Sequence, residues 1–154
     1  TAFLLWSKGA DKKWYCRREY YYSGRDKGRQ KTDKEFSDDL TAWLSGEKVR
    51  AVILDPAAAS FKAQLEKDGY KVKKAKNDVL DGIRFVATLL LSGSIFVDKS
   101  CENLIKEFAS YIWDAKAAER GEDKPVKEHD HALDALRYFC YTIIRKGGGI
   151  RILK

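Results

Sequence analysis

Cysteine is scarce in this chain of 154 residues, which contains only Cys16, Cys101 and Cys140. The three are odd in number and none belongs to a CxxC pair. The spacing therefore predicts neither a disulfide framework nor a structural zinc site. We expect the three thiols to be packing residues.

Long apolar runs are also lacking. The stretch at residues 85–91 is among the longest, and it is far shorter than the roughly 20 residues that a membrane span requires. The N-terminus shows no charged segment followed by an apolar one, as a secretion signal would. We therefore expect a cytoplasmic protein with no membrane partner.

Several catalytic motifs are missing as well. The chain has no GxSxG elbow, no phosphate-binding loop ending in Gly-Lys-Ser/Thr, and no GxGxxG after a predicted strand. These absences argue against serine hydrolase chemistry and against a nucleotide-binding site within the chain.

Positive charge is in excess, since 30 Lys and Arg residues face 23 Asp and Glu residues and leave a net charge of +7. This balance favours a polyanionic partner, although a merely basic protein would have the same composition. The run at residues 24–31 combines basic residues with two glycines. It is suited to following a phosphate backbone, but most runs of this kind are simply solvated.

Apolar periodicity and turn residues predict alternating strands and helices. A hairpin is expected at residues 2–6 and 14–22, with a turn at Gly9-Ala10-Asp11, and further strands at 49–54, 70–75 and 95–98. Helices are expected between Thr32, an N-cap candidate with Glu35 three residues on, and Gly46, at 60–67, 78–91 and 101–120, and from His129 onward. No linker divides the chain, so we expect one domain, residues 1–154. The order of elements predicts an α/β (α+β) fold with a mixed β-sheet flanked by helices.

Asp55 is a candidate functional residue because of its place in this pattern. It follows the run 49–54, which is apolar except for Arg50 and is typical of a central strand covered on both faces. In open α/β sheets, ligands gather beyond the carboxyl ends of such strands. The alternative is an aspartate that serves only a turn or the start of a helix.

The segment His129–Tyr138 is the second candidate, because it places a histidine and a carboxylate three residues apart on one predicted helix. At about 100° per residue, one face carries polar and aromatic side chains and the opposite face apolar ones. The first face holds His131, Asp134, Tyr138 and Tyr141, and the second holds Leu133, Leu136, Cys140 and Ile143.

The residues on the polar face also have simpler interpretations. Most helical aspartates, like Asp134, are solvated, and His131 could be a helix-start residue bonded to a neighbour. We expect the glutamates of the preceding helix, Glu107 among them, to lie on its solvated face.

Two carboxylates from a strand end and a helix suit hard divalent cations. Asp55 and Asp134 are thus predicted ligands for Mg²⁺ or Mn²⁺, which as a pair can promote hydrolysis of a phosphodiester. His131 could add a metal ligand, orient a water or shuttle a proton.

Four motifs, in order along nearly the whole chain, resemble the nuclease domain of tailed-bacteriophage terminase large subunits. They are Leu54-Asp55-Pro56, Asn77-Asp78-Val79-Leu80-Asp81-Gly82-Ile83, Tyr111-Ile112-Trp113-Asp114 and Asp130-His131-Ala132-Leu133-Asp134-Ala135-Leu136-Arg137-Tyr138. The resemblance implies an RNase H-like fold and a two-metal endonuclease that cuts concatemeric double-stranded DNA during capsid packaging. It assigns Asp55 as the second acid, Asp134 as the last and His131 as the accompanying histidine. The terminase small subunit, the capsid portal and the bacterial host cytoplasm follow as expected partners and location.

The resemblance departs from the family pattern at one point. The family begins this domain with a central strand that ends in an aspartate, and that strand would precede Thr1. We therefore expect the first strand, its metal ligand and the ATPase domain to be absent from residues 1–154, and this chain alone to be weak or inactive as a nuclease.

Two other functions are compatible with the sequence. One is an RNase H-like resolvase or transposase-type nuclease, which would prefer branched DNA. The other is a noncatalytic DNA-binding or motor-docking module, for which the charge of +7 suffices and the acids are structural.

Overall fold

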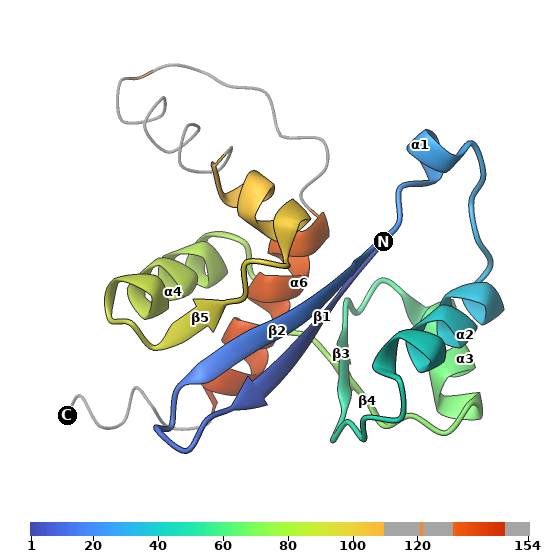
Figure 1. The fold of residues 1–154 in the computed structure, drawn as a ribbon, viewed down its shortest axis with the longest axis horizontal. Helices are drawn as coiled ribbons and strands as arrows, with labels where there is room; N and C mark the ends of the chain where they lie inside the picture. Colours follow the sequence, from blue (N-terminus) through green and yellow to red (C-terminus); the bar gives the residue numbers. More distant parts are fainter. Residues whose placement is uncertain (110–120, 122–130, 147–154) are drawn as a thin grey trace. The chain divides into compact units, whose positions relative to one another are not determined.

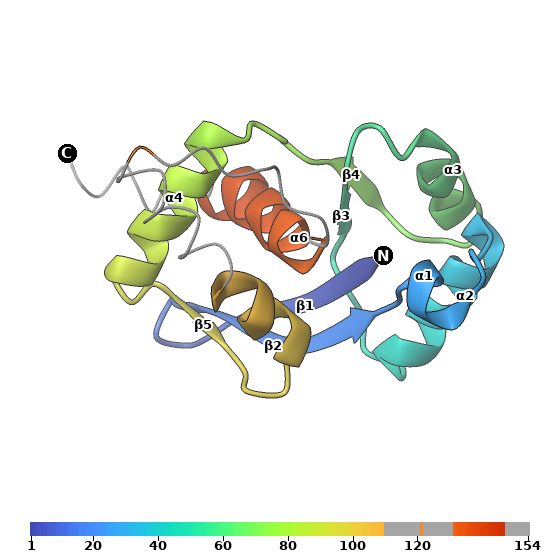
Figure 2. The same ribbon diagram turned by 90° about the horizontal axis from the view of Figure 1, so that it is seen from above.

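A computed structural model describes residues 1–109, 121 and 131–146. The chain divides into two compact units, drawn in Figures 1 and 2: unit 1 is Thr1–Tyr21 with Leu90–Leu136, and unit 2 is Tyr22–Leu89 with Arg137–Lys154. Among the described residues, no helix has the length and apolarity that crossing a membrane would require. The single domain stays a prediction.

Unit 1 contains a three-stranded sheet with the order β1-β2-β5. Its strands are β1 (Ala2–Lys8), β2 (Trp14–Tyr21) and β5 (Ile95–Val97). The first two form the predicted antiparallel hairpin, and β5 pairs with β2 in parallel, as Figure 1 shows. The predicted mixed sheet is therefore confirmed.

The hairpin carries a bulge in β2. Leu5 pairs with Arg18 and Trp6 with Cys16, so Arg17 is an extra residue between them. An extra residue reverses the alternation of side chains along a strand, which explains why the sequence of β2 alternates only imperfectly.

Buried thiols and a capping carboxylate join this sheet to the helix over residues 102–109. Cys16 and Cys101 are 1% and 0% exposed, and their Sγ atoms lie 4.0 Å apart. Glu19 accepts hydrogen bonds from the backbone N–H groups of Asn103 and Leu104, at 2.9 and 3.1 Å. These contacts satisfy donors at the start of the helix. The prediction that the cysteines are packing residues is confirmed.

Unit 2 begins with helices and a two-stranded sheet. Its elements are α1 (Gly24–Lys27), α2 (Asp33–Leu44), β3 (Val52–Leu54), α3 (Ala59–Lys67) and β4 (Val72–Lys74). Two helices, α4 (Leu80–Leu91) and α6 (His131–Phe139), contribute residues to both units, and the π-helical turn η1 (Cys140–Ile144) follows α6.

The prediction of a central strand covered on both faces is wrong for β3. Only Val52–Leu54 are extended, and all three are half-buried rather than buried. Within the described ranges 1–109 and 131–146, β3 pairs with β4 alone. A strand with one partner keeps one edge open, and burial is correspondingly incomplete.

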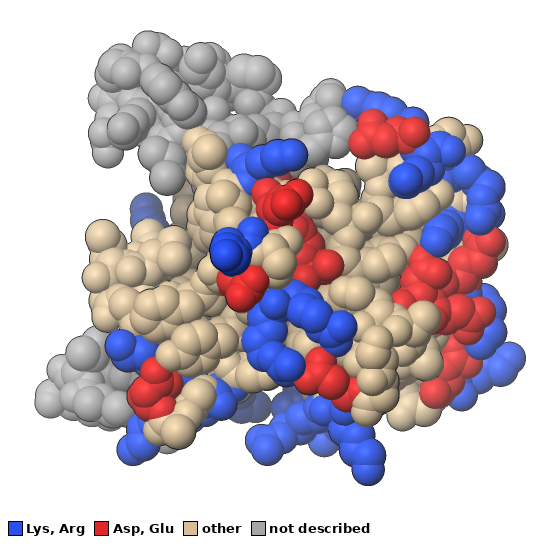
Figure 3. All heavy atoms as spheres, viewed as in Figure 1, with Lys and Arg blue, Asp and Glu red and all other residues tan. Residues whose placement is uncertain are grey.

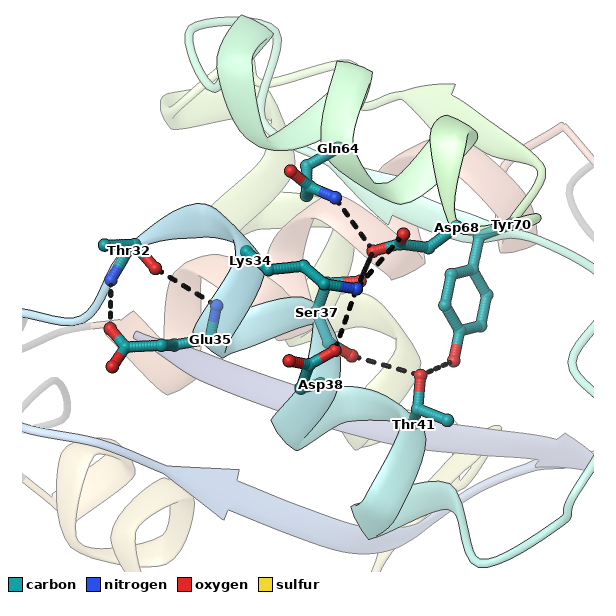
Figure 4. A network of polar contacts seen from close by, with 9 residues as sticks. All are labelled: Thr32, Lys34, Glu35, Ser37, Asp38, Thr41, Gln64, Asp68 and Tyr70. Atoms are coloured by element: carbon teal, nitrogen blue, oxygen red, sulfur yellow. Dashed lines mark hydrogen bonds and ion pairs between the residues drawn. The ribbon is translucent and has the colours of Figure 1, made fainter.

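A polar network fixes α2 to α3 (Figure 4). Thr32 and Glu35 form the capping box expected from the sequence. At the end of α3, Asp68 accepts hydrogen bonds from the Ser37 hydroxyl at 2.6 Å and from Gln64 at 3.0 Å, and it pairs with Lys34. The Ser37 hydrogen bond is the main reason that the pKa of Asp68 lies below its usual value.

Candidate active site

Asp55 follows β3, and its carboxylate is held by its own turn. Oδ1 accepts the backbone N–H of Ala57 at 2.9 Å, and the Asp55 carbonyl accepts the N–H of Ala58 at 3.0 Å. Aspartates commonly stabilise turns through such a bond to the backbone two residues on. The interpretation of Asp55 as a turn aspartate therefore accounts for the hydrogen bond at Oδ1 but not for Oδ2.

The second oxygen is bound by the C-terminal helix. The Tyr138 hydroxyl donates to Asp55 Oδ2 at 2.9 Å, across 83 positions of the chain. Tyr138 was predicted on the polar helix face, but the sequence assigned it no role. Since a carboxylate has about four lone-pair sites, each oxygen can still accept a cation. An oriented carboxylate of this kind fits Mg²⁺ or Mn²⁺, which prefer oxygen ligands.

Two more contacts tie the residues after β4 to the same helix. The backbone N–H of Lys76 donates to the Thr142 hydroxyl at 2.9 Å. Arg137 donates through Nη1 to the carbonyls of Asn77 and Asp78, at 2.8 and 2.9 Å. The carboxyl ends of β3 and β4 are therefore both anchored by residues 137–142.

Gly82 makes room for the buried Arg137 side chain, which is 7% exposed. A Cβ at position 82 would lie 2.8 Å from Arg137 Cγ and 2.9 Å from Cδ. Position 82 therefore requires glycine, because a Cβ there would overlap the Arg137 side chain. The motif around residues 77–83 thus supplies both the carbonyls that accept hydrogen bonds from Arg137 and the glycine that leaves space for the Arg137 side chain.

The start of α6 is capped by Glu107, in unit 1. Its carboxylate accepts the backbone N–H groups of Ala132 at 3.0 Å and Leu133 at 3.1 Å. The expectation that Glu107 lies on a solvated face is wrong, because the residue is only 9% exposed. A carboxylate at this position also interacts favourably with the helix dipole.

His131 and Asp134 occupy the first turn of α6, where His131 is exposed and Asp134 half-buried. Both belong to unit 1, whereas Asp55 and Tyr138 belong to unit 2. Their assignment to one site with Asp55 therefore stays a prediction. Within either unit, the described residues contain no cluster of three or more His, Cys, Asp or Glu that could hold a metal. Residues 111–114 and 129–130 of the predicted motifs lie outside the described residues.

The apolar face of the helix is buried as predicted at Leu133, Leu136 and Cys140, with 7%, 1% and 0% exposure, whereas the predicted Ile143 is only half-buried and Ile144 is buried instead. At Cys140 the period changes, because η1 begins there and Arg145 N–H donates to the Cys140 carbonyl. Tyr141 packs its ring against Phe85, with centroids 6.0 Å apart. Burial raises the pKa of Cys140, so its thiol is unsuited to nucleophilic chemistry.

Unit 2 also contains a cavity of about 420 Å³ at the other end of the two-stranded sheet. It is lined by Thr41, Leu44, Gly46, Glu47, Lys48, Val49, Gly69, Tyr70 and Lys71. These residues precede β3 and β4, whereas Asp55 follows β3. The cavity is therefore separate from the candidate site.

Known proteins resemble this chain over most of its length. The model of the terminase RNaseH-like domain family matches residues 2–142. The terminase large subunit of Escherichia phage T5 is 32% identical over 131 residues, which are 82% of this chain and 30% of that protein. The large terminase of a thermophilic bacteriophage, solved with ATP-gamma-S, is 51% identical, with a TM-score of 0.82 over 93% of this chain and 36% of that chain. The complex of the same phage terminase with ADP gives a TM-score of 0.83. The chain thus spans about a third of these relatives, and the likeness confirms the predicted fold class.

Proposed function

Because the chain belongs to the terminase RNase H-like domain family, as its motifs predicted, we propose that it is the nuclease domain of a viral DNA-packaging terminase. It would hydrolyse phosphodiester bonds of double-stranded concatemeric DNA. Its partners would be that DNA, the terminase small subunit and the capsid portal, and it would act in the cytoplasm of the bacterial host.

The observation that carries this proposal is the fixed carboxylate of Asp55. It follows a strand end, and each of its oxygens accepts one hydrogen bond, from Ala57 N–H and from the Tyr138 hydroxyl. This leaves one further lone pair on each oxygen for a cation. Asp55 is thus a preformed anionic ligand whose orientation does not depend on the metal.

Helical spacing supports the other two ligands. Asp134 precedes Tyr138 by four residues on α6, and His131 precedes Asp134 by three. Residues at these spacings share a helix face. We infer that the face that supplies Tyr138 to Asp55 also supplies Asp134 and His131.

In this proposal, Asp55, Asp134 and His131 would hold Mg²⁺ or Mn²⁺. A pair of such ions would supply an activated water and stabilise the leaving oxygen of the phosphodiester. Tyr138 keeps Asp55 oriented by donating its hydroxyl proton to Oδ2. His131 carries an imidazole, which can both accept and donate a proton, and is therefore suited to holding or moving a proton at the edge of the site.

A plasmid-nicking assay with Mn²⁺ tests the proposal. Asp55→Asn and Asp134→Asn should each abolish nicking, because they remove the negative charge while keeping the shape of the side chain. Asp81→Asn is the matched control, since Asp81 is an exposed aspartate of α4. Each variant is prepared as residues 1–154 and, where the gene encodes residues before Thr1, also with those residues.

Full nicking activity in both Asp55→Asn and Asp134→Asn would contradict the assignment. Cleavage of branched junctions in preference to linear duplex would indicate a resolvase-type nuclease instead. DNA binding with no metal-dependent cleavage in the extended protein would indicate a noncatalytic module.

A further inference from the structure

We propose that the basic side chains of the two-stranded sheet in unit 2 bind the phosphate backbone of duplex DNA and lead it toward Asp55. We call these side chains the basic strip; they are Lys48, Arg50, Lys71, Lys73, Lys74 and Lys76. The direction toward Asp55 rests on the proposed function, whereas the binding of DNA by the strip does not.

Strand pairing brings the members of the strip together. Lys48 and Lys71 line the same cavity before the strands, and Val52 N–H donates to the Lys71 carbonyl at 2.8 Å. Farther along, Lys74 pairs with Leu54, the residue immediately before Asp55. The strip therefore follows β4 toward the carboxylate, with Lys73 and Lys74 on opposite faces of the strand because successive side chains alternate.

The length of the strip suits a duplex. The five steps from Lys71 to Lys76 extend over about 17 Å at about 3.3 Å per residue. A duplex carries one phosphate charge per about 1.7 Å of axis, so several phosphates lie within reach of four flexible lysines.

The charges of the strip are not neutralised by any acid among the described residues. All six residues are exposed, and in the part of the chain that the structure describes none of them makes an ion pair. Residues 69–77 contain four lysines and no acid. In Figure 3, Lys and Arg side chains project at the bottom, below β3 and β4, whereas red and blue side chains alternate over α2.

Several other cations of unit 2 form ion pairs with acids. Within the run at residues 24–31, Arg29 pairs with Glu35 at 3.0 Å and Lys31 with Asp39. Lys34 and Lys62 also pair with acids, on α2 and α3. These cations have structural partners, so the run that the sequence indicated as a backbone contact is less suited to that role than the basic strip.

A structural explanation for the strip is protection of a strand edge. Lysines on edge strands discourage pairing with another chain, and β4 pairs with β3 alone among the described residues. This explanation predicts that neutral variants associate with themselves. The DNA proposal predicts instead that they lose affinity for DNA.

The test is the salt dependence of duplex binding. The variant Lys71→Gln/Lys73→Gln/Lys74→Gln/Lys76→Gln is compared with the unaltered protein by fluorescence anisotropy of a duplex of about 30 base pairs, in EDTA and at about 50 to 200 mM KCl. Each lost phosphate contact lowers the slope of log K against log salt by about 0.9. We expect the slope to fall by about 3 to 4, and affinity at about 50 mM to fall by about 100-fold or more.

The control variant removes the same charge elsewhere, from exposed Lys27, Lys67, Lys99 and Lys106. Its slope of log K against log salt should change by less than about 0.9, the value for one phosphate contact. Equal losses in the two variants would overturn the proposal, because only net charge would matter. Unchanged affinity with self-association in sedimentation would also overturn it, in favour of edge protection.

Two single variants guard against misfolding of the fourfold variant. Lys73→Gln and Lys74→Gln should each lower the slope by about 0.9, and two unchanged slopes would overturn the proposal. Because EDTA prevents metal-dependent cleavage, binding is measured apart from catalysis. If the strip variants lose affinity for DNA but the unaltered protein never cleaves DNA, only the nuclease proposal is contradicted. If the unaltered protein cleaves DNA but the strip variants bind it normally, only the proposal for the basic strip is contradicted.

Discussion

Tyr138 donates its hydroxyl proton to Asp55 Oδ2 at 2.9 Å, and this bond joins the end of β3 to the C-terminal helix. The acceptor is a carboxylate, so the bond belongs to the stronger class of hydrogen bonds, worth about 1.5 to 3 kcal/mol. It has two consequences, one for the orientation of Asp55 and one for the stability of unit 2.

Tyr138→Phe removes this bond and keeps the ring. We expect Mn²⁺ affinity, measured by calorimetry, and nicking activity to fall by about 10- to 100-fold, since about 1.4 kcal/mol corresponds to a factor of ten. Tyr141→Phe is the control, because Tyr141 packs its ring on Phe85 one turn later. A change in melting temperature without any change in Mn²⁺ affinity would mean that Tyr138 only stabilises the fold.

Local signals in the sequence predicted much of this fold. The turn at residues 9–11 predicted the hairpin, and Thr32 with Glu35 predicted the start of α2. Each of these signals lies within a few residues of the structure it determines. Asp55 was likewise selected as a candidate functional residue from its place at the end of an apolar run.

The missed features depend on contacts between residues far apart in the chain. Nothing in the spacing of the sequence shows that Tyr138 reaches Asp55, or that Glu107 caps α6. Likewise, the sequence shows every lysine but not which of them pair with acids. The basic strip became visible only once the ion pairs of α2 and α3 were known.

Glu107→Gln should destabilise the fold. The substitution removes the negative charge that faces the N-terminus of α6 while leaving one oxygen to accept from Ala132 and Leu133. We expect a loss of about 1 to 2 kcal/mol, or about 2 to 8 °C in melting temperature for a domain of this size. Thermal unfolding followed by circular dichroism measures it. Glu102→Gln, at an exposed position in the first turn of the helix that carries Glu107, should lower the melting temperature by less, because a solvated charge near a helix N-terminus contributes less; an equal fall there would exclude the capping role.

The capping box of α2 should weaken in acid. Hydrogen bonds from Arg29 and from Thr32 N–H lower the pKa of Glu35 from 4.5 to about 2. A folded-state pKa below the unfolded value means that the stabilisation is complete above pH of about 4.5 and is lost as the pH falls toward about 2. The difference in melting temperature between the unaltered protein and Glu35→Gln should therefore shrink over this range. Thr88→Ala, which removes an exposed hydroxyl that donates to the Arg84 carbonyl, should give a constant difference; a constant difference for Glu35→Gln would contradict the assigned pKa.

Gly82→Ala should destabilise the protein by about 1 to 3 kcal/mol, because the new Cβ would overlap the buried Arg137 side chain. In a helix without that neighbour, the same substitution is favourable by up to about 1 kcal/mol. Denaturant unfolding of a double-mutant cycle separates the two effects. If Arg137 is the cause, Gly82→Ala should become neutral or stabilising once Arg137→Ala is present. A loss of the same size in both backgrounds would place the steric conflict elsewhere, and would remove the reason for a glycine in the motif at residues 77–83.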